Sequence, residues 1–371
     1  MLLNNEVVIE NFENNRGQEP QNQGATMSHY VGLDVSMKET VICIVNEKGE
    51  SVHKGRSKSD PEKIAQHLMH TKFKIEKIGI ESGSLSHWLV DQLKKMQVPA
   101  ICIDARKMAA VLSIRVNKTD DNDAHGIAEA MRCGMYKEVS QKSQIAVETG
   151  TLMQCRRTLV HQRVQLINSI RGFLKTYGVR LGSSGEKEFP AKVRSRLSEI
   201  FEVARVGIDS LLNCFEKLCE EIRRLEHKIE ELAREDDDIK RLMTVPGVGL
   251  ITAMTFKTEI DDPRRFKKSR DVGAYFGMTP RQYSSGETKK QGHISKCGSS
   301  EARTLLTEAG LVCLTRSKKW SKVKAWGLKV MRRHGAKKAA VATGRKLAVI
   351  MHRMLIEKKD FIYGEEKPKA A

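Results

Sequence analysis

The order of the short apolar segments between residues 29 and 104 constrains the fold of this chain more than any other feature. Five of these segments have the β-rich composition of strands, at residues 29–37, 39–46, 51–57, 77–82 and 98–104. After the third of them, Asp60 and Pro61 open a helix as its N-cap and first residue. A second helix is expected at 84–96, between the last two strands. The order β-β-β-α-β-α-β, followed by helices, predicts an α/β domain whose first three strands form an antiparallel meander.

This order of elements is that of the ribonuclease H-like fold, whose first strand carries an aspartate at its centre. Asp34 in VGLDVS fits because side-chain alternation places it on the face opposite to Leu33 and Val35. A charge in the middle of such a strand is unfavourable unless it is paired or bound to a metal. Glu81 ends the apolar segment KIGI, next to the expected position of the first strand. The two carboxylates are therefore candidate metal ligands.

Three more carboxylates are crowded at the start of a later helical pattern, in KTDDNDAHGIAEA (118–130). Asp120 and Asp123 are three residues apart and fall on one face of a helix, whereas Asp121 points elsewhere and is expected to cap the helix. Each of these residues alone would be an ordinary cap or surface charge. Together with the two strand carboxylates, the first pair makes a quartet of oxygen ligands. Such a set suits two Mg²⁺ ions, which activate water or a hydroxyl for attack on phosphorus.

The net charge of +19 is concentrated in the last third of the chain. Residues 240–371 contain 30 Lys and Arg against 11 Asp and Glu, whereas residues 1–239 contain 35 of each sign. A basic segment joined to a neutral one predicts a polyanionic partner, most simply nucleic acid. No apolar run is long enough to span a bilayer, which argues against a membrane protein.

The first 26 residues are polar, rich in Asn and Gln, and lack the apolar core of a signal peptide. They are expected to form a disordered leader, and Met27 is an alternative start. The eight cysteines form no CxxC pair and no Cys/His ligand spacing, so we expect reduced core thiols in a cytoplasmic, nucleoid-associated protein. The expected domains are the leader, an α/β domain, a helical segment and a basic domain, at residues 1–27, 28–149, 150–239 and 240–371.

The helical segment contains a regular apolar repeat with spacings of four and three. Its members are Leu211, Phe215, Leu218, Ile222, Leu225, Ile229 and Leu232. A repeat sustained over three heptads predicts a coiled coil and a homo-oligomer, either a dimer or a tetramer. Packing of this seam against the chain's own helices is the alternative, and the repeat alone does not separate the two.

The basic segment opens with LMTVPGVGLITA (242–253), which is similar to the hairpin of helix-hairpin-helix modules. There, backbone N–H groups near Gly247 and Gly249 would hold a DNA phosphate. The segment then carries the polar block RQYSSGETKKQGHISK, in which a Ser-Gly turn is the ordinary interpretation. The cations around the two serines would bind a scissile phosphate: Arg281, Lys289, Lys290, His293 and Lys296. Farther on, residues 316–359 form basic amphipathic helices, whose charged face we expect to lie on nucleic-acid backbone.

Together, GLDVS, GIES, KTDDNDA and GAYFGMTPRQYSSGETKKQGHISKCGSSEARTLL resemble the insertion-sequence transposases of the DEDD-plus-serine type. The resemblance runs from about Tyr30 to Leu314. It implies a RuvC-like domain, a C-terminal transposase domain with a serine nucleophile, and a structured bridge RNA that pairs with donor and target DNA. By motif, the acidic quartet is Asp34, Glu81, Asp120 and Asp123, and the nucleophile is Ser285 rather than Ser284. Cys297-Gly298-Ser299-Ser300 stands where a basic residue, Gly and a polar pair are more usual.

The function predicted from the sequence is therefore that of a recombinase that cuts and rejoins the ends of an insertion element, using Mg²⁺ and a serine. Two other functions are considered: a structure-selective nuclease without a covalent intermediate, and a non-catalytic nucleic-acid-binding protein whose acidic residues are structural.

Overall fold

The computed structural model describes residues 27–113, 117–285 and 288–364. The chain divides into two compact units, one ending at Gln141 and the other beginning at Lys142, and each is described by itself. The predicted boundaries after residues 149 and 239 fall inside helices, so the helical and basic segments share the second unit.

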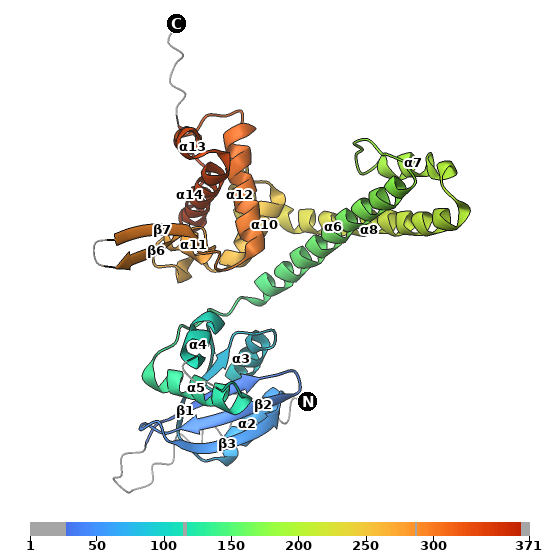
Figure 1. The fold of residues 1–371 in the computed structure, drawn as a ribbon. Helices are drawn as coiled ribbons and strands as arrows, with labels where there is room; N and C mark the ends of the chain where they lie inside the picture. Colours follow the sequence, from blue (N-terminus) through green and yellow to red (C-terminus); the bar gives the residue numbers. More distant parts are fainter. Residues whose placement is uncertain (1–26, 114–116, 286–287, 365–371) are drawn as a thin grey trace. The chain divides into compact units, whose positions relative to one another are not determined.

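The first unit is built on a mixed five-stranded sheet (Figure 1). Its strands are β1 (His29–Val35), β2 (Glu39–Val45), β3 (Ser51–Lys58), β4 (Ile75–Glu81) and β5 (Ala100–Ile103). The spatial order is β3-β2-β1-β4-β5. The pairs β1–β2 and β2–β3 are antiparallel, whereas β1–β4 and β4–β5 are parallel. The meander expected from the sequence is present, and β1 lies at the centre of the sheet.

Helices cover both faces of this sheet. On one face, α2 (Pro61–His70) and α3 (Ser86–Lys95) pack on Val31 and Leu33 of β1. The predicted N-cap is present, because the Asp60 side chain accepts a hydrogen bond from the Lys63 amide. On the other face lies α5 (Asp120–Cys133), which follows α4 (Ala105–Leu112). The predicted alternation along β1 therefore holds: its apolar side chains face α2 and α3, and Asp34 faces α5.

The contact between β1 and α5 is made by backbone. A Cβ atom on Gly32 would lie 2.0 Å from the Ala124 carbonyl oxygen and 2.5 Å from the Ala128 amide nitrogen. Only glycine permits this approach. Because Ala124 lies one turn after Asp120, the same contact places the start of α5 over the end of β1.

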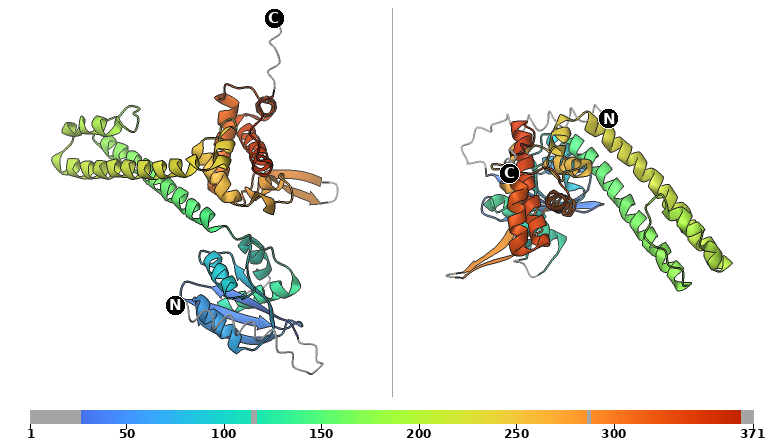
Figure 2. Two further views of the ribbon diagram at one scale, coloured as in Figure 1. Left: turned by 180° about the vertical axis from the view of Figure 1, so that it is seen from behind. Right: turned by 90° about the horizontal axis from the view of Figure 1, so that it is seen from above.

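The second unit begins with a helical hairpin (Figure 2). Its arms are α6 (Gln144–Thr176) and α8 (Glu202–Arg234), joined through α7 (Phe189–Arg194) and the short helix η1 (Leu197–Glu199). Ile170 and Leu174 of α6 pack with Leu212 and Phe215 of α8 in one apolar cluster. The predicted seam is thus used within the chain. Phe215, Ile222 and Ile229 are buried, whereas Leu218 and Leu225 are only partly covered.

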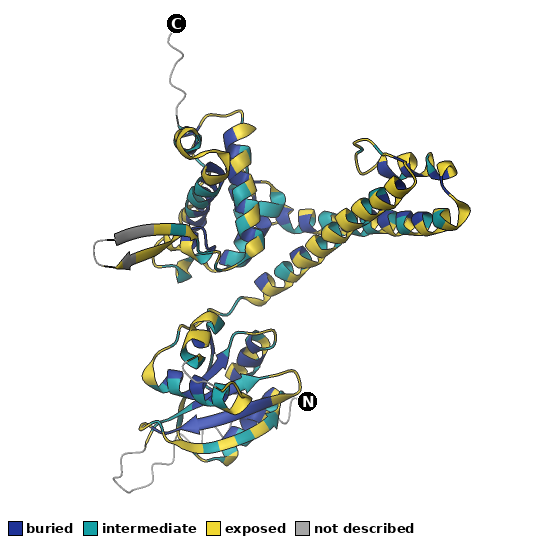
Figure 3. Ribbon diagram, in the orientation of Figure 1, coloured by how far each residue is buried: buried dark blue, intermediate teal, exposed yellow. Residues whose placement is uncertain are grey.

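The rest of the second unit is a mostly helical bundle. Its elements are α9 (Asp237–Met243), α10 (Leu250–Ile260), η2 (Pro263–Arg265), α11 (Asp271–Tyr275), β6 (Pro280–Ser285), β7 (Thr288–Ile294), α12 (Ser300–Thr315), α13 (Lys322–His334) and α14 (Ala336–Glu357). Phe256 and Phe276 are at the centre of its core, and Figure 3 shows the buried faces of α12 and α14. No helix in the described ranges is long and apolar enough to cross a lipid bilayer.

Candidate active site

Two of the four predicted carboxylates lie at the ends of neighbouring strands. Leu33 on β1 pairs with Ile80 on β4, so the next residues along these parallel strands, Asp34 and Glu81, are neighbours. Both side chains are half-buried. They lie at the carboxyl end of the parallel strands, where α/β sheets commonly place functional groups.

Helix α5 supplies the other two carboxylates. Thr119 is its N-cap, with its side-chain oxygen accepting from the Asn122 amide, so Asp120 and Asp123 both lie in the first turn. Carboxylates are favourable there because the helix dipole is positive at its N-terminus. The backbone contact at Gly32 then places this turn near the two strand carboxylates.

The pKa values of the strand carboxyls indicate that the four groups converge. The pKa of Asp34 is raised by burial and then by the negative charges of Asp120 and Asp123. The pKa of Glu81 is raised by burial and then by Asp34 and Asp123. Like charges gathered in a half-buried site oppose one another's ionisation. A cation among them would remove that cost.

Lys118 is a cation that the sequence analysis missed. Its positive charge lowers the pKa of both Asp34 and Glu81, although burial and the neighbouring carboxylates outweigh it. The side chain is exposed and stands two residues before α5. In the sequence, the position of Lys118 directly before the acidic residues of KTDDNDA could have identified it as part of the site.

Asp121 is not the helix cap that the sequence suggested, because Thr119 has that role. Its carboxylate lies 3.5 Å from a guanidinium nitrogen of Arg56 on β3, which also pairs with Glu39 at 2.9 Å. Asp121 therefore has a cationic partner outside the quartet, and its predicted direction away from Asp120 and Asp123 stays a prediction.

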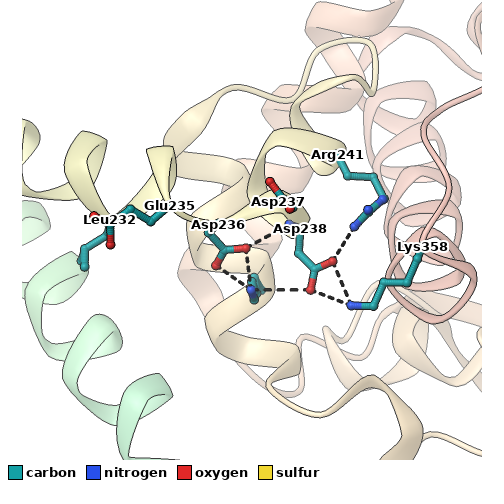
Figure 4. A pocket seen from close by; sticks show the side chains of 8 residues that line it. Leu232, Glu235, Asp236, Asp237, Asp238, Arg241 and Lys358 are labelled. Atoms are coloured by element: carbon teal, nitrogen blue, oxygen red, sulfur yellow. Dashed lines mark hydrogen bonds and ion pairs between the residues drawn. The ribbon is translucent and has the colours of Figure 1, made fainter.

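A second acidic cluster, in the second unit, provides a contrast (Figure 4). It lines a cavity of about 610 Å³. Asp236 accepts from Lys257 and caps α9, while Asp238 pairs with Arg241, Lys257 and Lys358. Burial raises the pKa of Asp238, but the hydrogen bond from Lys358 and the nearby positive charges outweigh it, so that pKa lies below its usual value. This cluster is neutralised by the protein itself, whereas the quartet in the first unit is not.

The quartet fits a divalent cation by its chemistry. All four groups are carboxylates, the ligands that hard cations such as Mg²⁺ take. In the described part of the chain, no three Asp, Glu, His or Cys side chains already lie close enough together to hold one ion.

The predicted nucleophile lies in the second unit, on an antiparallel ribbon made of β6 and β7. Ser285 is the last residue of β6, opposite Thr288, and it is exposed. The side chains of Ser284, Lys289 and Lys290 lie outside the described residues. Arg281 is exposed on β6, and its guanidinium donates to the Ser295 carbonyl oxygen at 3.4 Å.

The end of β7 and the loop that follows it carry two more of the predicted phosphate contacts. His293, near the end of β7, is exposed, and so is Lys296, whose φ is 56°. Both side chains are therefore accessible to a ligand of the ribbon.

The two glycines of the turn before α10 differ in their surroundings. Gly247 has φ of 87°, and a Cβ atom there would lie 2.3 Å from the Ala309 carbonyl oxygen, so packing alone requires glycine. Gly249 is exposed, has open space around it, and is the N-cap of α10 without a side-chain cap. The first amides of α10 therefore lack a side-chain acceptor.

The basic surface of the second unit is largely unpaired. Between Glu308 and Glu357 the sequence has thirteen Lys and Arg and no Asp or Glu. Of these cations, Arg353 is the one that forms an ion pair within the described residues, with Glu357. Lys337 and Lys338 are exposed in the first turn of α14, where the helix dipole disfavours cations. An arrangement that is unfavourable for folding indicates a polyanionic partner.

Comparison with known proteins identifies the family. Residues 239–325 match the model described as "Transposase IS116/IS110/IS902 family", and residues 31–179 match a DEDD transposase model of the IS110 type. A transposase for insertion sequence element IS1328 of Yersinia enterocolitica is 30% identical over 64% of this chain and 71% of that relative. The chain belongs to the IS116/IS110/IS902 family of transposases.

Two further relatives support the assignment. A transposase for insertion sequence element IS1111A of Coxiella burnetii is 29% identical over 90% of this chain and 91% of its own length. A probable family 20 transposase of Pseudomonas aeruginosa is 30% identical over 65% of this chain and 73% of its own length. The chain is thus a transposase of an insertion sequence, an enzyme of DNA strand transfer that binds DNA. Transposases of the DEDD type typically use divalent metal ions.

Proposed function

We propose that this transposase cuts and rejoins the ends of its element with the carboxylate quartet and Ser285, and that its first unit is a RuvC-like, ribonuclease H-like domain. The carrying observation is the convergence of Asp34, Glu81, Asp120 and Asp123. Burial, and then the charges of the other carboxylates, raise the pKa values of Asp34 and Glu81. The strand order β3-β2-β1-β4-β5, with the first acid on the central strand, supports the fold assignment.

In this proposal the quartet holds Mg²⁺, two ions per site, and Ser285 attacks the scissile phosphorus. Bound metal would neutralise charge on the phosphate and favour loss of a proton from the attacking hydroxyl. The serine oxygen forms a bond to phosphorus while the bond to a deoxyribose oxygen breaks, and the serine proton is released. A DNA hydroxyl later attacks the phosphoserine and releases the serine, so the bond energy is conserved.

The remaining contacts are assigned to nucleic acid. Arg281, Lys289, Lys290, His293 and Lys296 would bind the phosphate near the serine, and the amides near Gly247 and Gly249 would bind another. The unpaired cations of α13 and α14 would lie along backbone phosphates. Part of this surface is proposed to hold the structured bridge RNA, and the protein is proposed to work as a nucleoid-associated homo-oligomer.

The decisive experiment is trapping of a covalent protein–DNA adduct under denaturing conditions. The wild type and Ser284→Ala should form the adduct with guide RNA, Mg²⁺ and element DNA, and Ser285→Ala should not. Asp34→Asn should form none, because the metal site is lost. Cleavage without any adduct would replace this proposal with a nuclease that uses water. An adduct on Ser285→Ala that is absent from Ser284→Ala would assign the nucleophile to Ser284.

A further inference from the structure

Tyr283 stands two residues before the candidate nucleophile on the same face of the ribbon. Tyr283 lies opposite Lys290 and Ser285 opposite Thr288, and the register is regular from Gln282 to Ser285. Residues i and i+2 of a strand point to the same side, about 6–7 Å apart along the chain. Any nucleic acid that reaches Ser285 along this face also reaches Tyr283.

The ring of Tyr283 is placed by a glycine on the neighbouring strand. Gly292 is its diagonal cross-strand neighbour, and a Cβ atom there would lie 3.1 Å from Cε2 of the ring. Because Gly292 has no side chain, the ring can lie over β7 with one side covered. The tyrosine is nonetheless 57% exposed. One face of the Tyr283 ring is therefore covered by β7, and the other face is open to a ligand.

The surroundings of Tyr283 do not explain its presence. It belongs to none of the apolar clusters in the described residues, and its hydroxyl has no hydrogen-bond partner among them. An exposed aromatic side chain in a basic, DNA-binding unit is suited to stacking, since every base offers a π-face. Among the described residues, its ring lies against Gly292 and joins no apolar cluster.

We propose that Tyr283 is a positioning residue, whose ring stacks on the nucleobase next to the phosphodiester bond that is cut. The stacked base would fix the sugar and phosphate beside Ser285. This inference rests on the proposed role of Ser285. It concerns a different side chain, Tyr283, and it is tested by base fluorescence rather than by adduct formation. Loss of one base–aromatic stack should lower the rate of cleavage by about 5- to 150-fold.

The test uses the full-length protein with guide RNA and element DNA that carries 2-aminopurine at successive positions around the cleavage site. Stacking on tyrosine quenches the fluorescence of that base. The variants are Tyr283→Phe, Tyr283→Trp, Tyr283→Leu and Gly292→Val. Gln282→Leu, which changes an exposed residue on the opposite face of the same strand, is the matched control.

We expect one quenched position in the wild type, retained in the Phe, Trp and Gln282→Leu variants and lost in Tyr283→Leu. Cleavage by Tyr283→Leu should fall about 5- to 150-fold, mainly in kcat, with unchanged thermal unfolding. Gly292→Val should weaken the quenching although Tyr283 itself is intact, because the added side chain displaces the ring. Quenching that survives in Tyr283→Leu would overturn the proposal, and full quenching in Gly292→Val would overturn the role of the glycine.

Two further results separate this inference from the proposed function. Ser285→Ala should keep the quenched position while losing the covalent adduct, since stacking precedes the chemistry. If Ser285→Ala still formed the adduct, the serine assignment would fall, and the fluorescence would continue to test Tyr283. Loss of the adduct in Tyr283→Phe would make the tyrosine hydroxyl the nucleophile and would contradict both.

Discussion

The Ala124 carbonyl oxygen occupies the space that a Cβ atom on Gly32 would need, since the two would be 2.0 Å apart. Gly32→Ala should therefore push α5 away from β1 and separate Asp120 and Asp123 from Asp34. Crowding of this kind destabilises by about 1–3 kcal/mol. We expect loss of strand transfer together with faster hydrogen exchange in β1 and α5.

A glycine with open space is the control for that change. Gly172→Ala lies in the exposed face of α6 with nothing within 4 Å, so it should stabilise its helix by about 1 kcal/mol and leave activity intact. Wild-type activity in Gly32→Ala would show that α5 is not held by this contact.

The pH dependence of metal-free stability should report the pKa of Asp34, which burial and then the neighbouring carboxylates raise. Since the pKa of Asp34 is raised in the folded state, folding is favoured when this group is protonated, and its ionisation lowers stability as the pH rises from near 3.8 through the raised value. Asp34→Asn should therefore raise the Tm of the metal-free protein at neutral pH. The gain should disappear on acidification, where Asp34 is protonated in both states.

Added Mg²⁺ should reverse this order at neutral pH, because the wild type gains binding energy that Asp34→Asn lacks. Calorimetry with and without the metal checks both parts. A wild type that is more stable than Asp34→Asn at neutral pH in the absence of metal would contradict the raised pKa of Asp34.

The two neighbouring aspartates of α5 should behave differently. Asp123→Ala removes a member of the quartet and should abolish strand transfer. Asp121→Ala removes only an exposed pair with Arg56, which is worth about 0–1 kcal/mol, and should change activity little. Strand-transfer assays on the purified, folded variants test this. Equal loss in the two would mean that Asp121 takes part in the site.

Neutralising the first turn of α14 should weaken nucleic-acid binding and slightly stabilise the fold. Each phosphate contact contributes about −0.9 to the log–log salt slope on duplex DNA, so Lys337→Gln/Lys338→Gln should reduce the slope by up to about 1.8. Removing cations from a helix N-terminus favours the helix. The matched control is Lys192→Gln/Lys217→Gln, which removes two ion-paired cations from the hairpin. Equal slope changes in the two double variants would exclude a specific surface on α14.

Substitutions on the partly covered side of α8 test whether the protein self-associates through this helix. Leu218→Glu/Leu225→Glu should lower the mass measured by light scattering with little loss of helix, because both leucines are only partly covered. Ile222→Glu should instead unfold the hairpin, since the Ile222 side chain is buried. An unchanged mass in the double variant would exclude this face as an interface.

The strands and caps of the first unit were predictable because their signals are local. Asp60-Pro61 and the alternation around Asp34 depend on a few neighbouring residues. The choice of cap before α5 was not decided locally, since Thr119, Asp120 and Asp121 are all good N-caps. The structure uses Thr119, which leaves Asp120 inside the helix.

Features that depend on contacts in space were not predictable. A heptad repeat gives the buried face of α8 but not the identity of its partner, which is α6 of the same chain. The close contact at Gly32 and the proximity of Lys118 to Asp34 both require the position of α5 on the sheet. The start of α6 at Gln144, six residues before the predicted boundary, depends on Ser143, which caps it and also donates to Asp261.

The β6–β7 ribbon is exposed on both described faces, and two strands alone are marginally stable in water. We expect bound DNA that packs against the ribbon to add to its stability. A well-matched DNA should add more than a poor match, which would bind without placing Ser285 correctly. Discrimination between sites would therefore appear as slow turnover on bound DNA, and an equilibrium binding assay would underestimate it.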